Sequence, residues 1–293
     1  MPADKNFDLQ MQFEANVSKF AAAKAYHVTQ VLRGMETEQE AKAAMKIFNA
    51  RQQTEYNTAV ARARSAKQWE EWNTPKRVKI FPNIIWLPSR SVTRREAHIK
   101  FYNRIWAKND PFWLENMPGN LWNCKCDMQE THRRVTENSD VEPAPKVRGL
   151  EGNPAVTGEI FSENASYFTK IKSDTEAKKA VDKIVFQSLL TWAKTELKDK
   201  QVINKKFGEP IKFSNGGIEN YLNQPHEDYF VKNEMIRRIE AILKNAEYLG
   251  QTRQKGKISY IFSVKIKGKE NYLIANKRDN GIFFHGISKS SNL

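Results

Sequence analysis

The chain has 293 residues, 40% of them hydrophobic, and its 48 Lys and Arg residues against 34 Asp and Glu residues give a formal net charge of +14. This length predicts about two domains, and the charge points to a polyanionic partner or environment. No stretch holds the roughly 18 to 20 apolar residues that a membrane-spanning helix needs, and two cysteines are too few for a disulfide-built secreted scaffold. With no secretory signal near Met1, we expect a protein that folds in a reducing compartment and makes no contact with a membrane.

The first third of the sequence predicts two helices. Apolar residues recur at three- and four-residue steps over residues 9–31, which is typical of one buried helix face. A second helix is predicted over residues 41–69, and Pro75 ends it. Thr37 and Glu40 fit a capping box, in which hydroxyl and carboxylate each satisfy a free backbone N–H at the helix start.

The next segment, residues 75–134, is interrupted by prolines and rich in tryptophan. Five of the seven tryptophans lie between Trp72 and Trp122. Prolines exclude long helices, and large aromatic side chains supply buried surface that short segments otherwise lack. We therefore expect a compact, loop-rich unit held together by side-chain packing.

Residues 135–165 are rich in Pro, Gly, Ser and Asn, a composition typical of a linker or an extended arm. This predicts three parts of the chain: a first domain over residues 1–134, a linker or arm over 135–170 and a second domain over 171–293.

The last part begins with a predicted helix over residues 174–199, and Asn233 is predicted as the N-cap of another helix that reaches Ala246. The apolar period then changes from 3.6 to 2, which predicts three antiparallel strands: 258–266, 272–275 and 282–287. Tight turns join them at Gly268 and at Asn280-Gly281. The fold class is therefore α+β: long N-terminal helices, the compact Trp- and Pro-rich unit, and a C-terminal domain of helices and antiparallel sheet.

Cys124 and Cys126 allow three interpretations. A disulfide between them would be strained, because residues i and i+2 of an extended segment sit near the upper limit of disulfide geometry. A structural zinc site would need further nitrogen or sulfur ligands, which His98 and His132 could supply. In the third interpretation the two thiols are simply buried against the tryptophans.

Four short motifs stand in order in this region: Arg94–His98 with the spacing Arg-x-x-x-His, Asp110–Trp113, Pro118–Asn120 and Trp122–Cys126. Together with the helix over residues 55–70 they resemble the conserved block of the phage Mu F-like head morphogenesis family, the minor head (minor capsid) proteins, over residues 50–132. The resemblance implies a protein that associates with portal, scaffold and capsid proteins, is packaged with DNA in the virion, and is made in the bacterial host cytoplasm. It also implies that a basic block faces packaged DNA or an acidic partner, the alternative being a solvated surface. The block consists of Arg90, Arg94, Arg95, Lys100, Arg104 and Lys108.

The last domain resembles the phage-associated barnase–EndoU–colicin–RelE-like nucleases over residues 200–290. The stretches that carry the resemblance are Asn223–His226, Lys232–Glu234, Leu243–Ala246 and the final strands. The resemblance implies a barnase-like fold and a metal-independent, toxin-type ribonuclease from a phage or prophage, with RNA such as tRNA as its partner. The alternative is a purely structural head protein whose last domain binds protein or DNA without catalysis.

Metal-independent RNA cleavage needs a base for the 2′-OH, an acid for the leaving 5′-oxygen and cations around the phosphate. His226 and His285 are the candidate acid and base, and Lys257 and Ser288 are further candidate catalytic residues. In a regular strand Ser288 projects to the face opposite His285, so the two act together only if a bulge intervenes. The candidate nucleic-acid-binding residues are Arg237, Lys265 and Arg278 in this domain and Arg94 and Arg95 in the basic block. For each of these residues the ordinary alternative is a packed histidine or a solvating charge.

Overall fold

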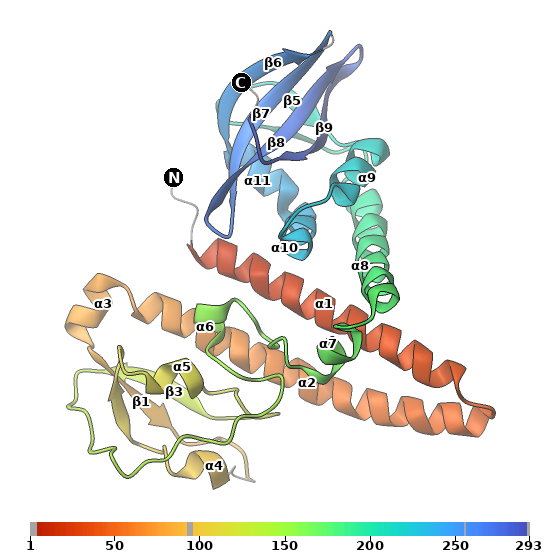
Figure 1. The fold of residues 1–293 in the computed structure, drawn as a ribbon. Coiled ribbons are helices and arrows are strands. Elements are labelled where there is room, and N and C mark those ends of the chain that lie inside the picture. The colour runs from red at the N-terminus through yellow and green to blue at the C-terminus, as the bar shows by residue number, and fades with distance from the viewer. Residues whose placement is uncertain (1–4, 93–95, 255, 292–293) are drawn as a thin grey trace. The chain divides into compact units, whose positions relative to one another are not determined.

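The structure is a computed structural model that describes residues 5–92, 96–254 and 256–291 (Figure 1). It divides into two compact units: a central unit of residues 20–178, and a terminal unit of residues 1–19 together with 179–293. The α+β class predicted from the sequence is confirmed, because long helices come first and a helix-and-sheet region comes last. Within the described residues, no helix combines the length and the apolar character needed to cross a membrane.

Two long helices begin the chain, as their apolar periodicity predicts. α1 spans Lys5–Arg33 and α2 spans Glu38–Trp72. The Thr37 hydroxyl accepts a hydrogen bond from the Glu40 N–H, and the Glu40 carboxylate accepts one from the Thr37 N–H. The predicted capping box is therefore present, and it sets the first residue of α2.

The rest of the central unit consists of short elements, as its prolines predict. In chain order they are α3 (Pro75–Ile80), β1 (Asn83–Leu87), α4 (Glu96–Ile99), β2 (Ile105–Ala107), α5 (Phe112–Glu115), β3 (Asp127–Thr131), α6 (Pro154–Thr157) and α7 (Ser166–Ile171). The strands form an antiparallel sheet in the order β2-β1-β3. One hydrophobic core packs on it, formed by Ile84, Trp86, Phe101, Trp106, Trp113, Met117 and Met128. Aromatic packing therefore takes the place of long elements in this part of the central unit.

Residues 135–165 form an extended arm that packs on the central unit. Leu150 and Ile160 of the arm are buried, and so is Arg62 of α2. Arg62 Nε donates to the Ile160 carbonyl oxygen at 2.7 Å, and Arg62 Nη1 donates to the Leu150 carbonyl oxygen at 2.8 Å. A single buried guanidinium thus satisfies backbone acceptors that the irregular arm leaves without partners.

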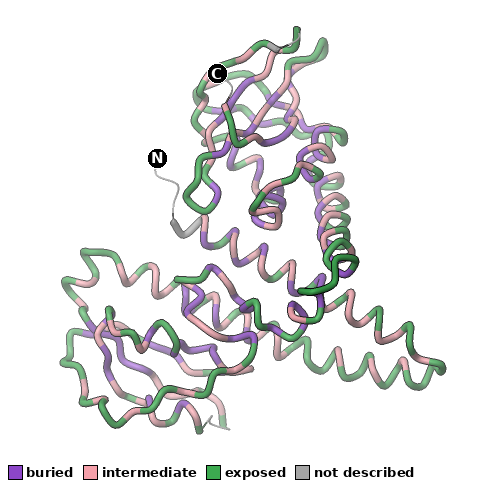
Figure 2. The backbone as a smooth tube through the Cα atoms, in the orientation of Figure 1, coloured by how far each residue is buried: buried purple, intermediate pink, exposed green. Residues whose placement is uncertain are grey.

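The terminal unit combines helices with a six-stranded sheet. After the start of α1, its elements are α8 (Thr175–Glu196), β4 (Gln201–Ile203), β5 (Pro210–Lys212), α9 (Asn215–Asn223), α10 (Tyr229–Glu234), the 3-10 turn η1 (Met235–Arg238), α11 (Ile239–Asn245), β6 (Glu247–Gln254), β7 (Lys257–Ile266), β8 (Lys269–Arg278) and β9 (Gly281–Ser288). The strand order is β4-β5-β9-β8-β7-β6, and every neighbouring pair is antiparallel except β5 with β9. Buried positions alternate along β8 and much of β9, so that one face of the sheet lies on the core (Figure 2).

The three strands predicted at the end of the chain are confirmed as β7, β8 and β9, but the predicted N-cap at Asn233 is wrong. Asn233 lies inside α10 and is fully buried, and the single predicted helix is split into α10, η1 and α11. α10 begins after Asp228, and the polar run Lys232–Glu234 at its end is buried inside the unit. Residue polarity predicts the reverse, since such side chains are usually exposed.

Helix α9 covers the edge of β9 that no strand reaches. β5 pairs with β9 only at Ile282 and Phe283. Further along, Asn220 Nδ2 donates to the His285 carbonyl oxygen at 2.8 Å, and Gln224 Oε1 accepts from the Ile287 N–H at 2.7 Å. Side chains of the helix therefore take the place of a neighbouring strand and protect the edge.

Candidate functional site

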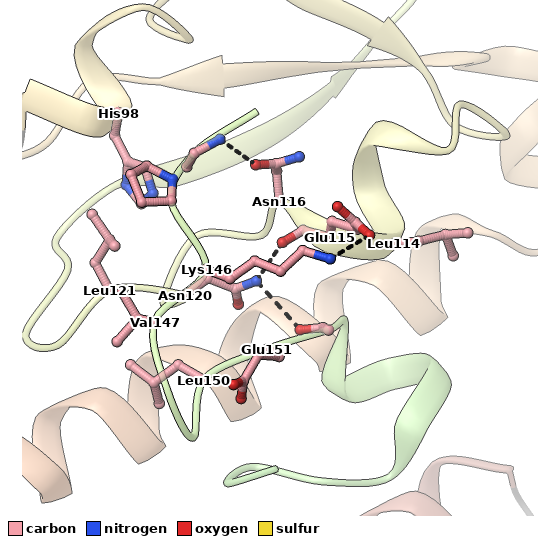
Figure 3. Close-up of a pocket in the computed structure, with 13 residues that line it drawn as sticks. His98, Leu114, Glu115, Asn116, Asn120, Leu121, Lys146, Val147, Leu150 and Glu151 are labelled. Atoms are coloured by element: carbon pink, nitrogen blue, oxygen red, sulfur yellow. Dashed lines mark hydrogen bonds and ion pairs between the residues drawn. The ribbon is translucent and has the colours of Figure 1, made fainter. Parts of the chain in front are cut away.

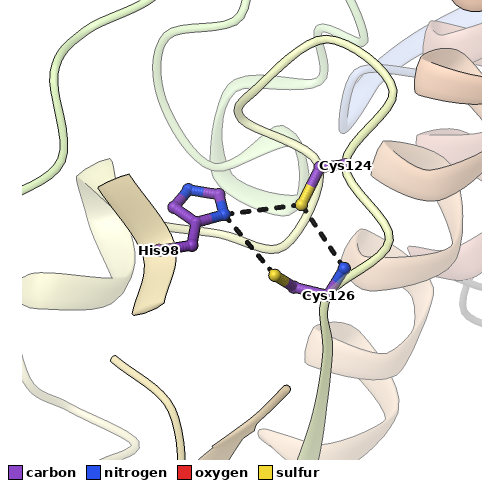
Figure 4. Close-up of side chains that lie close together, drawn as sticks. All are labelled: His98, Cys124 and Cys126. Atoms are coloured by element: carbon purple, nitrogen blue, oxygen red, sulfur yellow. Dashed lines mark hydrogen bonds between the residues drawn. The ribbon is translucent and has the colours of Figure 1, made fainter. Parts of the chain in front are cut away.

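Candidate residues come together at two places, one in each unit. In the central unit the imidazole of His98 faces two thiols (Figure 4). His98 belongs to α4, Cys124 lies in the loop after α5, and Cys126 stands directly before β3. His98 Nδ1 lies 3.5 Å from Cys124 Sγ and 3.6 Å from Cys126 Sγ. Both thiols are free, and these three side chains have the donor types and the proximity that a metal ion needs.

The fourth ligand considered from the sequence, His132, is exposed and lies outside this cluster. Around the two sulfurs, the Cys126 N–H donates to Cys124 Sγ at 3.5 Å. Hydrogen bonds from Cys126 and His98 lower the pKa of the Cys124 thiol to about 4. The bond to Cys124, followed by burial, raises the pKa of the Cys126 thiol. The two sulfurs are therefore unequal, and Cys124 is the one that loses its proton more readily.

A cavity of about 220 Å³ lies against His98, between the arm and the loop after α5 (Figure 3). Its polar walls are already hydrogen-bonded to each other. Lys146 Nζ pairs with the Glu115 carboxylate at 3.0 Å, and Asn116 Oδ1 accepts from the Ala144 N–H at 3.1 Å. These bonds fasten the arm to the loop, so we assign the cavity a packing role.

The basic block is largely engaged inside the central unit. Its described members pair as follows: Arg90 with Asp127 at 3.2 Å, Lys100 with the Pro143 carbonyl oxygen at 3.2 Å, Arg104 with Asp140 at 2.9 Å and Lys108 with Glu130 at 3.1 Å. Lys108 is buried, whereas the Arg90 side chain is 75% exposed. Arg94 and Arg95 lie outside the described residues. Among the described members of the block, Arg90 is the exposed one.

In the terminal unit, His226 lies between α9 and α10 with both ring nitrogens occupied. Nδ1 accepts a hydrogen bond from the Asp228 N–H at 2.9 Å, so the proton of the neutral ring is on Nε2, which lies 3.0 Å from Asn271 Oδ1 and donates to it. Asn271 is buried on the core face of the sheet. His226 therefore has no free lone pair with which to act as a base.

His285 lies on the other face of the sheet. We call this the open face and define it by Lys257, Ser259, Asn276, Arg278, Phe283 and His285. The register supports the assignment, because Ser259 lies opposite Asn276 and Asn276 lies opposite Phe283. Burial, then the charges of Arg278 and Lys257, lower the pKa of His285. Among the residues that the structure describes, neither Lys257 nor Arg278 forms an ion pair.

An aromatic ring lies beside these cations. The Arg278 guanidinium carbon is 4.8 Å from the centre of the Phe283 ring, and Lys212 Nζ of β5 is 5.9 Å from it. Phe283 is partly exposed. Cations around a half-exposed ring form a surface on which a nucleobase can stack while its phosphate is neutralised.

A β-bulge places Ser288 on the open face as well. β8 pairs Ala275 with Phe284 and Ile274 with Gly286, so His285 is the extra residue. After the bulge, Ser288 lies opposite Tyr272, which is on the open side of β8. The condition under which His285 and Ser288 share a face is therefore met.

The remaining candidate cations are paired. Lys265 Nζ lies 3.6 Å from the Glu270 carboxylate, and Arg237 Nε lies 3.0 Å from the Glu234 carboxylate. The Arg237 guanidinium carbon also lies 5.1 Å from the Trp192 ring centre. The structure thus brings together His285, Lys257 and Arg278, and it sets Lys265 and Arg237 apart in ion pairs.

Sequence reasoning missed Phe283 and Lys212 on the open face and the buried Lys232. The alternation of β9 was the available signal for Phe283, since it shares a face with His285 two residues away. Lys212 lies on a three-residue strand, which is too short to show a period. Lys232 carries no signal at all, because nothing in a single sequence distinguishes a buried lysine from an exposed one.

The comparisons with known proteins reach only the terminal unit. Residues 180–284 match the family model described as large polyvalent protein-associated domain 3. The match indicates a phage-associated domain and covers less than half of the chain. No curated protein and no solved structure matches the chain. The resemblances to the Mu F-like block and to the nuclease therefore stay predictions.

Proposed function

We propose that this is a phage or prophage minor head protein whose terminal unit binds and cleaves RNA on its open face without a metal. The similarity of residues 180–284 to a polyvalent protein-associated domain supports the phage origin. The order and spacing of the motifs within residues 50–132 support the head role. Portal, scaffold or capsid proteins and packaged DNA are the partners proposed for the central unit.

The observation that carries the RNA-cleaving role is that His285 shares the open face with Lys257 and Arg278 and lies near enough for both charges to lower its pKa. Burial, followed by the charges of Arg278 and Lys257, lowers the pKa of His285 and so favours the neutral imidazole, which can take a proton. The unpaired cations are suited to hold the phosphate and to stabilise the charge that builds up on it. Phe283 offers a stacking surface beside them.

In the proposed reaction His285 takes the proton of the 2′-OH, and that oxygen attacks the adjacent phosphorus. The bond to the 5′-oxygen breaks, and a cyclic phosphate and a free 5′-hydroxyl are formed. The open face offers Lys257 and Ser288 for the second proton transfer. His226 takes no part, because it is bound to Asn271 on the core face.

A second candidate function is RNA or DNA binding without cleavage. It is favoured by the single imidazole on the open face: of the two histidines in the described terminal unit, only His285 lies there. In this case the face holds a nucleic-acid backbone, and His285 contributes charge when protonated.

The experiment uses the full chain with a mixed RNA substrate in the presence of a chelator. We expect cleavage to a cyclic phosphate end, and we expect His285→Gln to slow it by about 100-fold or more while RNA binding persists. His226→Gln is the matched control and should cleave like the wild type. A wild-type chain that binds RNA without cleaving it would establish the second candidate. Equal cleavage by wild type and His285→Gln would exclude His285 as the base.

The head role has its own test. Particles induced from the host that carries the gene are purified on a density gradient, and their proteins are identified by mass spectrometry. We expect the chain to sediment with DNA-filled heads at a constant ratio to the major capsid protein. Its absence from the particles would contradict the head role and leave the ribonuclease proposal unaffected.

A further inference from the structure

The His98, Cys124 and Cys126 cluster has the dimensions of a metal site. We infer that these three side chains bind one Zn²⁺ ion through His98 Nδ1 and the two sulfurs, with a solvent molecule as the fourth ligand. The ion would fasten α4 to the segment before β3 on the aromatic core of the central unit. This inference does not depend on the function of the terminal unit.

The distances between the donors carry the inference. With zinc–nitrogen bonds of about 2.0 Å, zinc–sulfur bonds of about 2.3 Å and tetrahedral angles, a nitrogen and a sulfur ligand lie about 3.5 Å apart. The two observed distances are 3.5 Å for His98 to Cys124 and 3.6 Å for His98 to Cys126. All three donor atoms lie within 4.8 Å of one another, which is close enough for one ion to bind all three.

A second observation comes from the side chains around the sulfurs. The Nε1–H of Trp86 is fully buried and has no hydrogen-bond acceptor within normal distance. Trp86 lies beside the cluster, with its ring centre 5.0 Å from that of His98. The Tyr102 hydroxyl lies 3.9 Å from Cys126 Sγ. A buried N–H and a hydroxyl next to a sulfur are hydrogen-bond donors of the kind that a metal-bound thiolate needs.

Charge and access both fit zinc. Two thiolates and a neutral imidazole cancel the charge of a divalent ion, so the complex is neutral and tolerates burial. Nitrogen and sulfur donors in tetrahedral positions favour zinc over magnesium or calcium. Cys126 is only partly buried, which leaves a way in for the ion.

Solvent is the fourth ligand because the neighbouring protein donors are engaged or distant. The nearest carboxylate in sequence, Asp127, is held by Arg64 at 2.8 Å and by Arg90 at 3.2 Å. His132 is exposed and outside the cluster. Among the described residues of this unit, the group of side chains close enough to share a metal ion consists of His98, Cys124 and Cys126, with no fourth member.

The first measurement is the metal content of the full chain. After incubation with zinc and dialysis against metal-free buffer, we expect about one zinc ion per chain in the wild type. We expect below about a tenth of that in Cys124→Ser, Cys126→Ser and His98→Ala. His132→Ala is the matched control and should keep its zinc. A wild type without zinc overturns the inference, and so does a Cys126→Ser variant that retains it.

A second measurement uses the wild-type chain alone, because an unfolded variant would also lose zinc. Replacing zinc by Co²⁺ should give strong sulfur-to-cobalt charge-transfer absorption and the intense visible bands of a tetrahedral ion. One equivalent of Zn²⁺ should remove both. A weak octahedral spectrum without the charge-transfer band would overturn the inference.

Discussion

The Arg62 guanidinium of α2 lies 2.8 Å from the Leu150 carbonyl oxygen of the arm, although 88 residues separate them in the chain. Arg62 is fully buried and donates further to the carbonyl oxygens of Glu151 and Ile160 and to Asn120. Burial lowers the pKa of Arg62 to about 9, so the side chain is still charged at neutral pH. One buried cation therefore replaces the regular hydrogen-bond ladder that an irregular arm lacks.

We expect Arg62→Lys to destabilise the central unit by about 3 kcal/mol, because a lysine keeps the charge but cannot reach the same fork of acceptors. Six of the seven tryptophans lie in this unit, so fluorescence during urea unfolding reports on it. The matched control is Arg64→Lys, two residues along the same helix, where the side chain is 57% exposed. Arg64→Lys should lower the free energy of unfolding by no more than about 1 kcal/mol. Equal effects of the two substitutions would contradict the role of Arg62.

Two adjacent glycines at the start of α9 should respond in opposite directions. A Cβ on Gly217 would lie 2.1 Å from the Phe284 carbonyl oxygen, whereas one on Gly216 would meet nothing within 4 Å. We expect Gly217→Ala to destabilise the terminal unit by about 3 kcal/mol, because the helix must retreat from β9. Gly216→Ala should stabilise it by about 0.5–1 kcal/mol through helix propensity. Hydrogen exchange of peptides from α9 and β9 measures both, and a neutral Gly217→Ala would show that α9 does not need this close approach.

Lys232 should make the stability of the terminal unit depend on pH. Its ammonium is buried at the end of α9, where it donates to the carbonyl oxygens of Tyr221 at 2.7 Å and Gln224 at 2.8 Å. Burial lowers its pKa to about 7 from 10.5. Between these two values the unfolded chain holds more protons than the folded one, so stability rises with pH.

Between pH 7 and pH 9 we expect the free energy of unfolding of the terminal unit to rise by about 2 kcal/mol more in the wild type than in Lys232→Met. Lys232→Met should be less stable than the wild type at every pH, because it leaves the last carbonyl groups of α9 without a donor. Its stability should also lack the rise with pH that Lys232 causes. Hydrogen exchange of the same unit at several pH values checks it. Parallel pH profiles for the two proteins would mean that Lys232 stays charged when folded.

The cations of the open face should control the pKa of His285. Arg278 and Lys257 both lower it, so Lys257→Ala or Arg278→Ala should raise the pKa of His285. Lys265→Ala is the matched control, because Lys265 is on the same strand as Lys257 but is paired with Glu270. NMR titration of the imidazole resonances measures the shift. An anion bound on the open face should also raise this pKa, so RNA affinity should increase as the pH falls, and His285→Gln should remove that increase.

Local sequence patterns were sufficient for the elements whose residues are close together in the chain. The capping box at Thr37 and Glu40, the apolar stripes of the long helices and the turns at Gly268 and Gly281 all depend on neighbours within a few residues. The grouping of His98 with Cys124 and Cys126 could also be considered from residue type alone. In each case the physical cause is backbone geometry or donor chemistry, which a short stretch of sequence contains.

The positions of the two histidines depended on contacts between distant residues. His226 lies in a polar stretch of the sequence and His285 between apolar residues of the last strand, yet it is His226 that Asn271 holds on the core face of the sheet. The bulge at His285 changes which residues share a face with it, and the short parallel pairing of β5 with β9 brings Lys212 beside Phe283.

The +14 net charge by itself determined that a polyanionic partner was worth considering, but it could not say which cations were free to meet one. Ion pairing within the fold decided that. Arg104 and Lys108 face carboxylates in the central unit, while Lys257 and Arg278 face His285 on the open face. The reason is that an ion pair depends on the distance in space between two charged groups, and only the folded chain sets that distance.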